Sequence, residues 1–263
     1  MSLALPWRLV NAPLLDAIPA PLTRPRGNAT ARTLARADWL IRQKRNGRFV
    51  AAACRGGSGW RIEPLALLSA HTTTALNNLI GRLDLRSSTA TLPFGDLPSV
   101  LRHLGIPDSY GNQHGLDLVA EPCELAFAGF DRYRRALWLT GPASASWRRM
   151  QRAALAERVF LDAISGYRSH AYQWGIFQRK IDHGQSVQQI LAVNAAPGYS
   201  EHHSGRALDI GTPGQPPAEE SFERTPAFAW LMTNAGRFGF RLSYPRDNPH
   251  GIVYEPWHWC WHG

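Results

Sequence analysis

The sequence has few cysteines, and it contains no long hydrophobic run. Its three cysteines, Cys54, Cys123 and Cys260, are too few for a disulfide framework, and none forms the CxxC pair of a structural zinc site. Because no stretch of about 18 apolar residues occurs, no membrane-spanning helix is predicted. With 263 residues, of which 44% are hydrophobic, the chain is long enough to bury a core. The composition predicts a soluble globular protein.

Lysine is also scarce, although the chain is basic. Only Lys44 and Lys180 are lysine, and the other basic residues are arginine, giving a formal net charge of +9. Such a charge favours a polyanionic partner, but it does not distinguish nucleic acid from a cell-wall polymer or a lipid surface, and a solvated basic surface is the simpler alternative. The first ten residues lack a basic start, and Pro6 breaks their apolar stretch. No secretory signal is therefore predicted.

The pattern of apolar and turn-forming residues predicts an α+β protein with two parts. The turn-rich segment 105–115 predicts a boundary between an N-terminal accessory domain, 1–110, and a C-terminal domain, 111–263. In the smaller first part we expect an extended proline-rich lead-in over 1–27 and a helix from Asn28 to about residue 45. A β-hairpin over 48–62 and helices within 65–83 and 98–104 follow.

The second part is predicted to be a mainly antiparallel sheet framed by helices. The expected strands lie near 124–130, 136–140, 159–164, 207–210, 240–244 and 252–261. The expected helices cover 142–158, two stretches between 170 and 194, and 225–238. Such a mixture is typical of a sheet with helices packed on it.

The first part also has a weak resemblance to small winged helix-turn-helix DNA-binding domains. It combines helix, hairpin and helix with clustered arginines such as Arg32, Arg36 and Arg42. It shows no base-reading signature, so we interpret it as an accessory domain of unknown role and do not expect nucleic acid as the partner.

Three separate segments of the second part contain polar residues that a simple core does not need. They are SGYRS at 165–169, SEHHSGRALD at 200–209 and EPWHWCW at 255–261. Two imidazoles and one carboxylate, His202, Asp209 and His258, form the kind of ligand set that leaves a divalent metal an open position for water. Glu255 is placed to take the proton of that water. Residues 255 and 258 would lie on opposite faces of a regular strand, so we expect either that Pro256 bends the chain there or that the segment is not a regular strand.

These motifs, in this order and spacing, resemble the VanY-type D-alanyl-D-alanine carboxypeptidases, which are metallopeptidases of peptidoglycan. The central pattern SxHxxGxAxD is present from Ser200 to Asp209, and EPWH is present from Glu255 to His258. The resemblance covers roughly residues 112–263.

The resemblance implies a role for each matching position. His202, Asp209 and His258 would bind Zn²⁺, and Glu255 would be the general base. Arg168 would stabilise the oxyanion, an interaction that grows in the transition state. Two further residues, Gln173 and Ser200, would contact the substrate near its terminal carboxylate. A structural ion pair is the alternative for Arg168, and His203 is expected to stand outside the ligand set.

One position departs from the family pattern. Cys260 stands where the family commonly has arginine after WHW, and in a strand it shares a face with His258 and His262. A thiolate beside the metal and a small buried thiol behind the site are both open interpretations.

The leading hypothesis is a zinc-dependent D,D-carboxypeptidase that trims the terminal D-alanine of peptidoglycan stem peptides. The alternatives are an L,D-carboxypeptidase, a phage-type endopeptidase with the same site, and a non-catalytic cell-wall or nucleic-acid binding protein. Against the last stands Glu255, which a purely structural metal site does not need. The substrate implies a periplasmic or extracellular location, and the oligomeric state stays undetermined.

Overall fold

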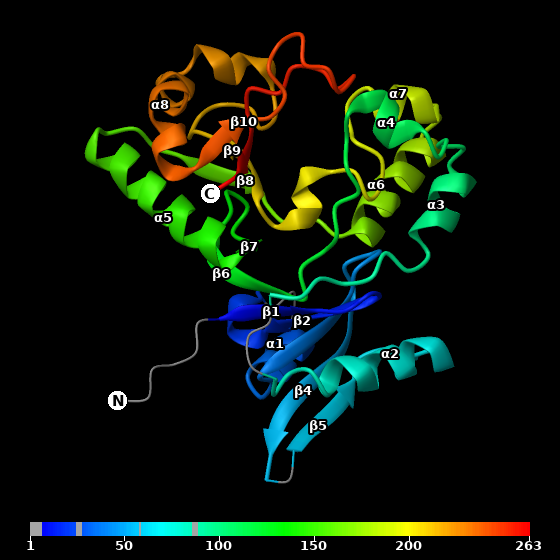
Figure 1. Ribbon diagram of the computed structural model, residues 1–263. Helices are drawn as coiled ribbons and strands as arrows, with labels where there is room; N and C mark the ends of the chain where they lie inside the picture. The colour runs from blue at the N-terminus through cyan, green and yellow to red at the C-terminus, as the bar shows by residue number, and fades with distance from the viewer. Residues whose placement is uncertain (1–6, 25–27, 58, 86–88) are drawn as a thin grey trace.

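The chain folds into two antiparallel sheets with helices packed on their faces (Figure 1). This computed structural model describes residues 7–24, 28–57, 59–85 and 89–263. Within that part of the chain, no helix is both long and apolar enough to cross a membrane. The predicted α+β class is confirmed.

The large sheet has seven strands in the order β5-β4-β3-β2-β1-β6-β7, and all neighbours are antiparallel. Its strands are β1 (Arg8–Asn11), β2 (Leu15–Pro19), β3 (Trp39–Gln43), β4 (Phe49–Gly56), β5 (Gly59–Pro64), β6 (Glu124–Phe130) and β7 (Ala136–Leu139). The sheet therefore contains strands from both sides of the boundary predicted at residue 110. The division into 1–110 and 111–263 stays a prediction.

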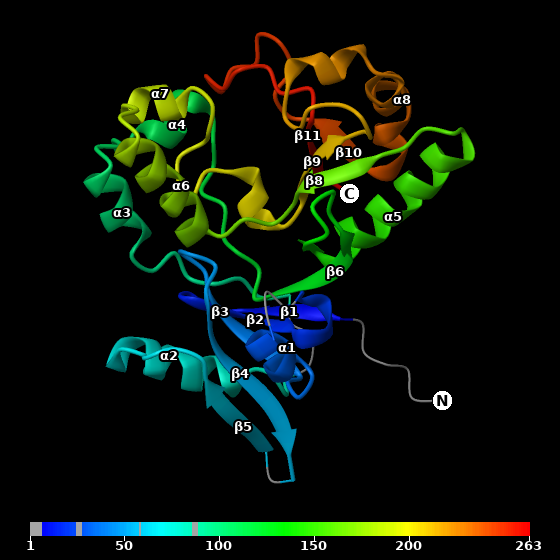
Figure 2. The ribbon, with the colours of Figure 1, turned by 180° about the vertical axis from the view of Figure 1, so that it is seen from behind.

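Helices cover both faces of the central strands. Leu76 and Leu79 of α2 (Ala70–Ile80) pack against Ile41 on one face, and α1 (Asn28–Leu34) contributes Leu34 to a cluster with Leu40 on the other. Seen from behind, α1 lies in front of the sheet and α2 beside the projecting β4–β5 hairpin (Figure 2). Because both faces are covered, successive residues along β3 are buried on opposite sides.

Two expectations for the first part are wrong. The predicted helix from Asn28 to residue 45 ends at Leu34, and Trp39–Gln43 forms strand β3 instead. The expected lead-in over 1–27 contains β1 and the fully buried β2 inside the large sheet, while residues 1–6 and 25–27 lie outside the described residues. The predicted hairpin is confirmed as β4 paired with β5, although Ser58 of its turn is not among the described residues.

The small sheet carries four antiparallel strands in the order β10-β11-β9-β8. Their bounds are β8 (Asp162–Ser165), β9 (Ala207–Gly211), β10 (Phe240–Leu242) and β11 (His258–Trp261). The helices around the sheet are α3 (Leu97–His103), α4 (Tyr110–His114), α5 (Gly141–Ala156), α6 (His170–Asp182), α7 (Val187–Leu191) and α8 (Pro226–Asn234). Short 3₁₀ helices include η2 (Glu201–Ser204) and η4 (Ala235–Phe238).

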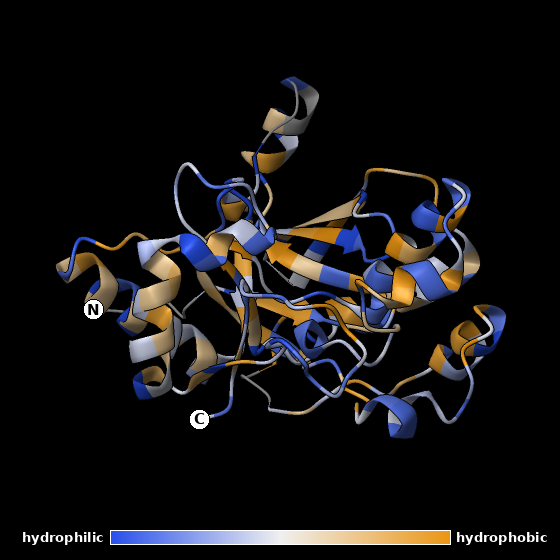
Figure 3. Ribbon diagram, turned by 90° about the horizontal axis from the view of Figure 1, so that it is seen from above, coloured by the Kyte–Doolittle hydropathy of each residue, from blue (hydrophilic) through white to orange (hydrophobic). Residues whose placement is uncertain are grey.

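The small sheet has one apolar face and one polar face, as strand alternation requires. Leu208, Ile210 and Trp259 belong to a core with Trp147 of α5 and Leu231 of α8. Asp209 of β9 and His258 of β11 face the other way, and they line one cavity together with Gln173 and Lys180 of α6. In Figure 3 the strands are mostly orange, whereas the outer helices alternate between blue and orange. Two of the side chains singled out above, Asp209 and His258, therefore lie on the polar face of this small sheet.

Candidate active site

Strand register brings two of the predicted metal ligands together. Asp209 of β9 lies directly opposite His258 of β11, so their side chains leave the sheet side by side. The Asp209 Oδ1 atom lies 3.2 Å from His258 Nδ1 and 3.3 Å from His202 Nε2. All three residues are buried, and their candidate ligand atoms lie within 4.8 Å of one another. The structure therefore brings His202, Asp209 and His258 into one cluster.

His202 reaches this cluster from η2, which ends in a tight left-handed turn. Gly205 follows η2 with φ +65°, a conformation that L side chains rarely adopt. A Cβ atom there would lie 2.3 Å from Leu125 Cδ2, a clash with the core of the large sheet. The glycine of the SxHxxG pattern thus lets η2 pack closely and sets the position from which His202 points at Asp209.

Hydrogen bonds fix the tautomers of both histidines. His202 Nδ1 lies 2.7 Å from the carbonyl oxygen of Gly166, and His258 Nε2 lies 2.8 Å from Glu201 Oε2. Since a carbonyl and a carboxylate only accept here, each of these nitrogens donates. The opposite nitrogens, His202 Nε2 and His258 Nδ1, face Asp209 and are left to act as ligands. Such outer hydrogen bonds are typical of metal-binding histidines.

The donor spacing fits a single zinc ion. Nitrogen, oxygen and sulfur ligands of one tetrahedral zinc lie about 3.3–3.8 Å apart, which follows from Zn–ligand bonds of about 2.0–2.3 Å. The observed 3.2 and 3.3 Å between Asp209 and the two imidazoles are close to that range. Three protein ligands leave the fourth position of such an ion open to solvent or substrate. The residues present therefore fit the predicted Zn²⁺.

The electrostatics of the cluster favour a cation. Burial opposes a charge on His258, yet hydrogen bonds to Asp209 and Glu201 raise its pKa to about 10. Burial would likewise raise the pKa of Asp209, but His202 and His258 outweigh it and hold this pKa below its usual range. Burial lowers the pKa of His202, which keeps that imidazole in the neutral form that binds metal.

Glu255 lies at the rim of the cluster, where the chain bends. The backbone N–H of His258 donates to the carbonyl oxygen of Glu255 at 3.0 Å, so residues 255–258 form a tight turn and β11 begins only at His258. The bend expected at Pro256 is confirmed. Glu255 Oε2 lies 3.8 Å from His258 Nδ1, and burial raises the pKa of Glu255 to about 7. A carboxyl group of that pKa can both accept and donate a proton near neutrality.

Arg168 enters the site from the segment between β8 and α6. Its Nη1 donates to Gln173 Oε1 at 3.0 Å, and its Nη2 lies 3.8 Å from Asp209 Oδ2. Ser169 begins α6, because its hydroxyl accepts the backbone N–H of Tyr172. Gln173, one turn into α6, donates to the carbonyl oxygen of Ala195 at 2.9 Å. This helix start therefore holds Arg168 and Gln173 against each other.

All seven predicted site residues line one cavity of about 310 Å³, and these are Arg168, Gln173, Ser200, His202, Asp209, Glu255 and His258. The cavity lies between the polar face of the small sheet and the helical side that contains α6. Its walls therefore come from segments up to 90 residues apart in the chain.

The sequence interpretation missed three residues of this region. Glu201 holds His258, Lys180 lines the cavity seven residues after Gln173 on α6, and the buried Tyr244 ring packs beside His258 with centroids 4.8 Å apart. Glu201 adjoins His202 in the motif, and two helical turns separate Lys180 from Gln173, so spacing could have indicated both.

His203 lies outside the ligand set but does have a structural role. Its Nδ1 donates to the carbonyl oxygen of Arg168 at 2.6 Å, and its Nε2 accepts the backbone N–H of Gly198 at 3.0 Å. Both ring nitrogens are therefore engaged in holding the loops that carry Arg168 and Ser200.

Comparison with known proteins gives matches to the second half of the chain. Residues 137–263 match the family model VanY, described as D-alanyl-D-alanine carboxypeptidase. The putative carboxypeptidase YodJ of Bacillus subtilis is 34% identical over 152 residues, covering 56% of this chain and 54% of that protein. The bifunctional D-Ala-D-Ala dipeptidase and D-Ala-D-Ala carboxypeptidase VanXYC of Enterococcus gallinarum is 30% identical over 157 residues, covering 57% of this chain and 80% of that protein.

Among solved structures, the LdcB LD-carboxypeptidase is 34% identical with a TM-score of 0.45, and the match covers 48% of this chain and 60% of that one. The chain spans about half the length of the B. subtilis relative.

Proposed function

Because this chain belongs to the VanY family of D-alanyl-D-alanine carboxypeptidases, we propose that it hydrolyses the terminal D-alanine bond of peptidoglycan stem peptides in a zinc-dependent reaction. The observation that supports this most strongly is the single cavity shared by all seven predicted site residues. Such a substrate lies outside the cytoplasm, so the protein would act in the periplasm or the extracellular space.

The metal ligands would be His202 Nε2, Asp209 and His258 Nδ1. When bound there, Zn²⁺ would lower the pKa of its bound water to about 7 and would polarise the scissile carbonyl. The carbonyl oxygen of Gly166 and the Glu201 carboxylate hold the imidazoles of His202 and His258 in the orientation that the ligand set needs.

Glu255 would act as the general base and then as the general acid. Its carboxylate accepts a proton from the attacking water and later delivers that proton to the leaving amine of D-alanine. No covalent intermediate with the protein is needed, so the serines near Arg168 are not nucleophiles in this mechanism.

Arg168 and Gln173 would act on the substrate itself. The guanidinium of Arg168 points into the cavity and would stabilise the oxyanion that develops at the scissile carbonyl. The terminal carboxylate of the substrate would lie near Gln173 and Ser200, with the ammonium of Lys180 in the same cavity wall. Two cations in one cavity favour a substrate that ends in a free carboxylate, and this supports a carboxypeptidase over an endopeptidase.

The test is a substrate screen with the zinc-loaded chain. We expect release of D-alanine from a synthetic stem pentapeptide ending in D-Ala-D-Ala, detected by mass spectrometry, and no cleavage within intact sacculi. Release from the tetrapeptide alone would replace the proposal with an L,D-carboxypeptidase. Cleavage inside sacculi alone would indicate an endopeptidase, and no hydrolysis of any substrate by zinc-loaded, folded protein would refute a catalytic function.

A further inference from the structure

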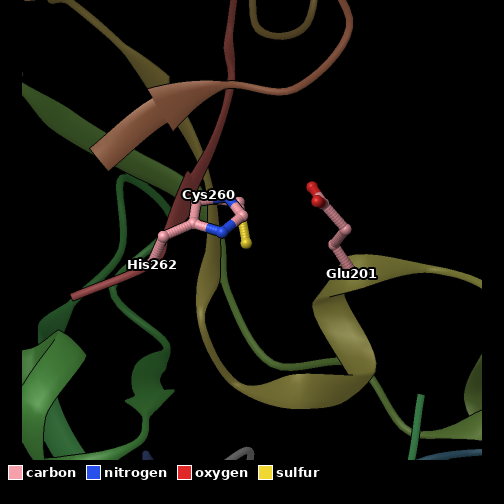
Figure 4. Close-up of side chains that lie close together, drawn as sticks. All are labelled: Glu201, Cys260 and His262. Carbon is pink, nitrogen blue, oxygen red and sulfur yellow. The ribbon is translucent and has the colours of Figure 1, made fainter. Parts of the chain in front are cut away.

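A second group of potential metal ligands lies beside the first, further along β11. Glu201, Cys260 and His262 each offer one ligand atom, and these atoms lie within 4.8 Å of one another. Figure 4 shows the His262 ring beside Cys260, with the Glu201 carboxylate facing them from η2. Their position follows from strand alternation, because residues 258, 260 and 262 leave β11 and its extension on one face. His258 belongs to the first group, and the next two residues on that face, Cys260 and His262, belong to the second together with Glu201.

The chemistry of the second group differs from that of the first. A thiol, an imidazole and a carboxylate suit a borderline-soft divalent ion such as Zn²⁺, and the thiol is the softest donor in either group. Cys260 also stands at the position where the family resemblance places an arginine. In this chain a potential metal ligand therefore stands at that position, close to the Glu201 carboxylate.

The surroundings leave room for an ion and its remaining ligands. Cys260 is buried, the Glu201 side chain is 25% exposed, and His262 is exposed near the end of the chain. Donors of one zinc ion lie about 3.3–3.8 Å apart, whereas these atoms lie within 4.8 Å of one another, so the group must contract slightly to hold one. The exposed His262 side chain can rotate to do this, and the open side leaves a position for water.

We propose that Glu201, Cys260 and His262 form a second site for a divalent transition-metal ion, separate from the cluster of His202, Asp209 and His258. On binding, the S–H bond of Cys260 breaks, its proton passes to solvent, and a bond forms between Sγ and the ion. The site has three protein ligands, one of them exposed, and it binds its ion more weakly than the buried cluster does.

Glu201 connects the two sites. Its Oε2 accepts the hydrogen bond from His258 Nε2 at 2.8 Å, and its carboxylate also faces Cys260. An ion bound to this carboxylate draws negative charge away from the hydrogen bond and makes His258 a poorer ligand. Occupancy of the second site therefore weakens metal binding at the first, and the coupling is reciprocal.

Cobalt spectroscopy tests the proposal directly. The chain is first loaded with one equivalent of Zn²⁺ under anaerobic conditions and is then titrated with Co²⁺. We expect a second equivalent to bind, with the near-ultraviolet absorption of thiolate-to-cobalt charge transfer. The first cluster has no sulfur, so this absorption reports the second site alone.

Variants assign the absorption to the three residues. Cys260→Ser should abolish it, whereas Cys54→Ser and Cys123→Ser, which alter the other two buried cysteines, should leave it unchanged. His262→Ala and Glu201→Gln should weaken Co²⁺ binding at this site by about 10- to 100-fold. His262 is exposed, so its replacement carries little risk to folding.

Three outcomes would overturn the proposal. They are no charge-transfer absorption in the unmodified chain, absorption that survives Cys260→Ser, and absorption whose Co²⁺ affinity is indifferent to both His262→Ala and Glu201→Gln. Peptidase activity is not part of the readout. A chain that shows the absorption but hydrolyses no stem peptide would refute the proposed function and leave this site standing.

Discussion

The two sheets contribute to the candidate active site in different ways. The small sheet carries Asp209 and His258 on one face, and their contact follows from strand register. All seven predicted site residues in the cavity lie outside the strands of the large sheet. The large sheet reaches the site through Glu121, which pairs with Lys44 Nζ at 2.6 Å and accepts the backbone N–H of His170 at 2.9 Å.

Glu121 also accepts the hydroxyl of Tyr167, which in turn accepts a hydrogen bond from Asn11 of β1 at 2.8 Å. Tyr167 and His170 flank the segment that carries Arg168. We call the buried group of Asn11, Lys44, Glu121 and Tyr167 the junction, and it holds this segment from the side of the large sheet. The cavity residues would carry out the chemistry, and the junction holds the segment that carries Arg168 in place. Substitutions at the cavity should change turnover at constant stability, and substitutions at the junction should change stability first.

The largest effect is expected for Glu255→Gln. Loss of the proton-transferring carboxylate should lower kcat for D-alanine release by about 10²- to 10⁴-fold, while zinc content by elemental analysis and Tm stay near those of the unmodified chain. Glu157→Gln, on the exposed end after α5, is the matched control. Near-normal turnover in the Glu255 variant would remove the general base from the mechanism.

The next effect concerns stability at the junction. Lys44→Met leaves the buried Glu121 carboxylate without its ammonium partner, and it should lower the free energy of unfolding by about 3–5 kcal/mol, measured by urea denaturation. The double variant Lys44→Met/Glu121→Gln should recover part of this loss, because no buried charge is left alone. A single variant as stable as the unmodified chain would show that the two sheets do not depend on this pair.

Arg168→Lys should act on chemistry with less effect on binding. A lysine cannot reproduce the planar guanidinium, so kcat should fall by about 10²- to 10³-fold with little change in KM. The opposite pattern, a raised KM with unchanged kcat, would assign Arg168 to ground-state binding.

The junction should also give the protein a sensitivity to acid. Burial would raise the pKa of Glu121, but Lys44 and His170 outweigh burial and lower it to about 2. The stabilisation is present in full above the unfolded-state pKa of about 4.3 and is lost as the pH falls through about 2; it amounts to about 3 kcal/mol. Unfolding free energies measured across this range should fall more steeply for the unmodified chain than for Lys44→Met/Glu121→Gln. Parallel curves would show that the Glu121 carboxylate does not supply this stabilisation.

The smallest effect is expected for Lys180→Met. In the proposed function the Lys180 ammonium lies near the substrate carboxylate, so its removal should raise KM by about tenfold, equivalent to about 1.4 kcal/mol, and leave kcat nearly unchanged. Steady-state kinetics on the stem pentapeptide measure this. An unchanged KM would place the substrate carboxylate elsewhere in the cavity.

The candidate site could be predicted from the sequence because its chemistry restricts residue types. Metal binding and proton transfer require imidazoles and carboxylates, so His202, Asp209, Glu255 and His258 stand out at any position in the fold. Spacing alone could have drawn attention to Glu201 and Lys180, but their roles depend on which side chains lie across the cavity. Strand register decides that, and it is not visible in local spacing.

The first part of the chain was harder to predict, because its strands are buried on both faces. Leu34, Leu40 and Ile41 repeat at a spacing that satisfies a helix, yet Leu40 and Ile41 face opposite sides of the large sheet. Strands covered on both sides lose the polar alternation that identifies them. The partners that make β3 a strand, β2 and β4, lie on either side of it in space.

An anomalous-scattering map of crystals grown with zinc, recorded on both sides of the zinc absorption edge, tests the central claim most directly. We expect a peak within bonding distance of His202 Nε2, Asp209 and His258 Nδ1, with one coordination position of the ion open toward Glu255. No peak among these three side chains, or an ion enclosed by four protein ligands, would contradict it.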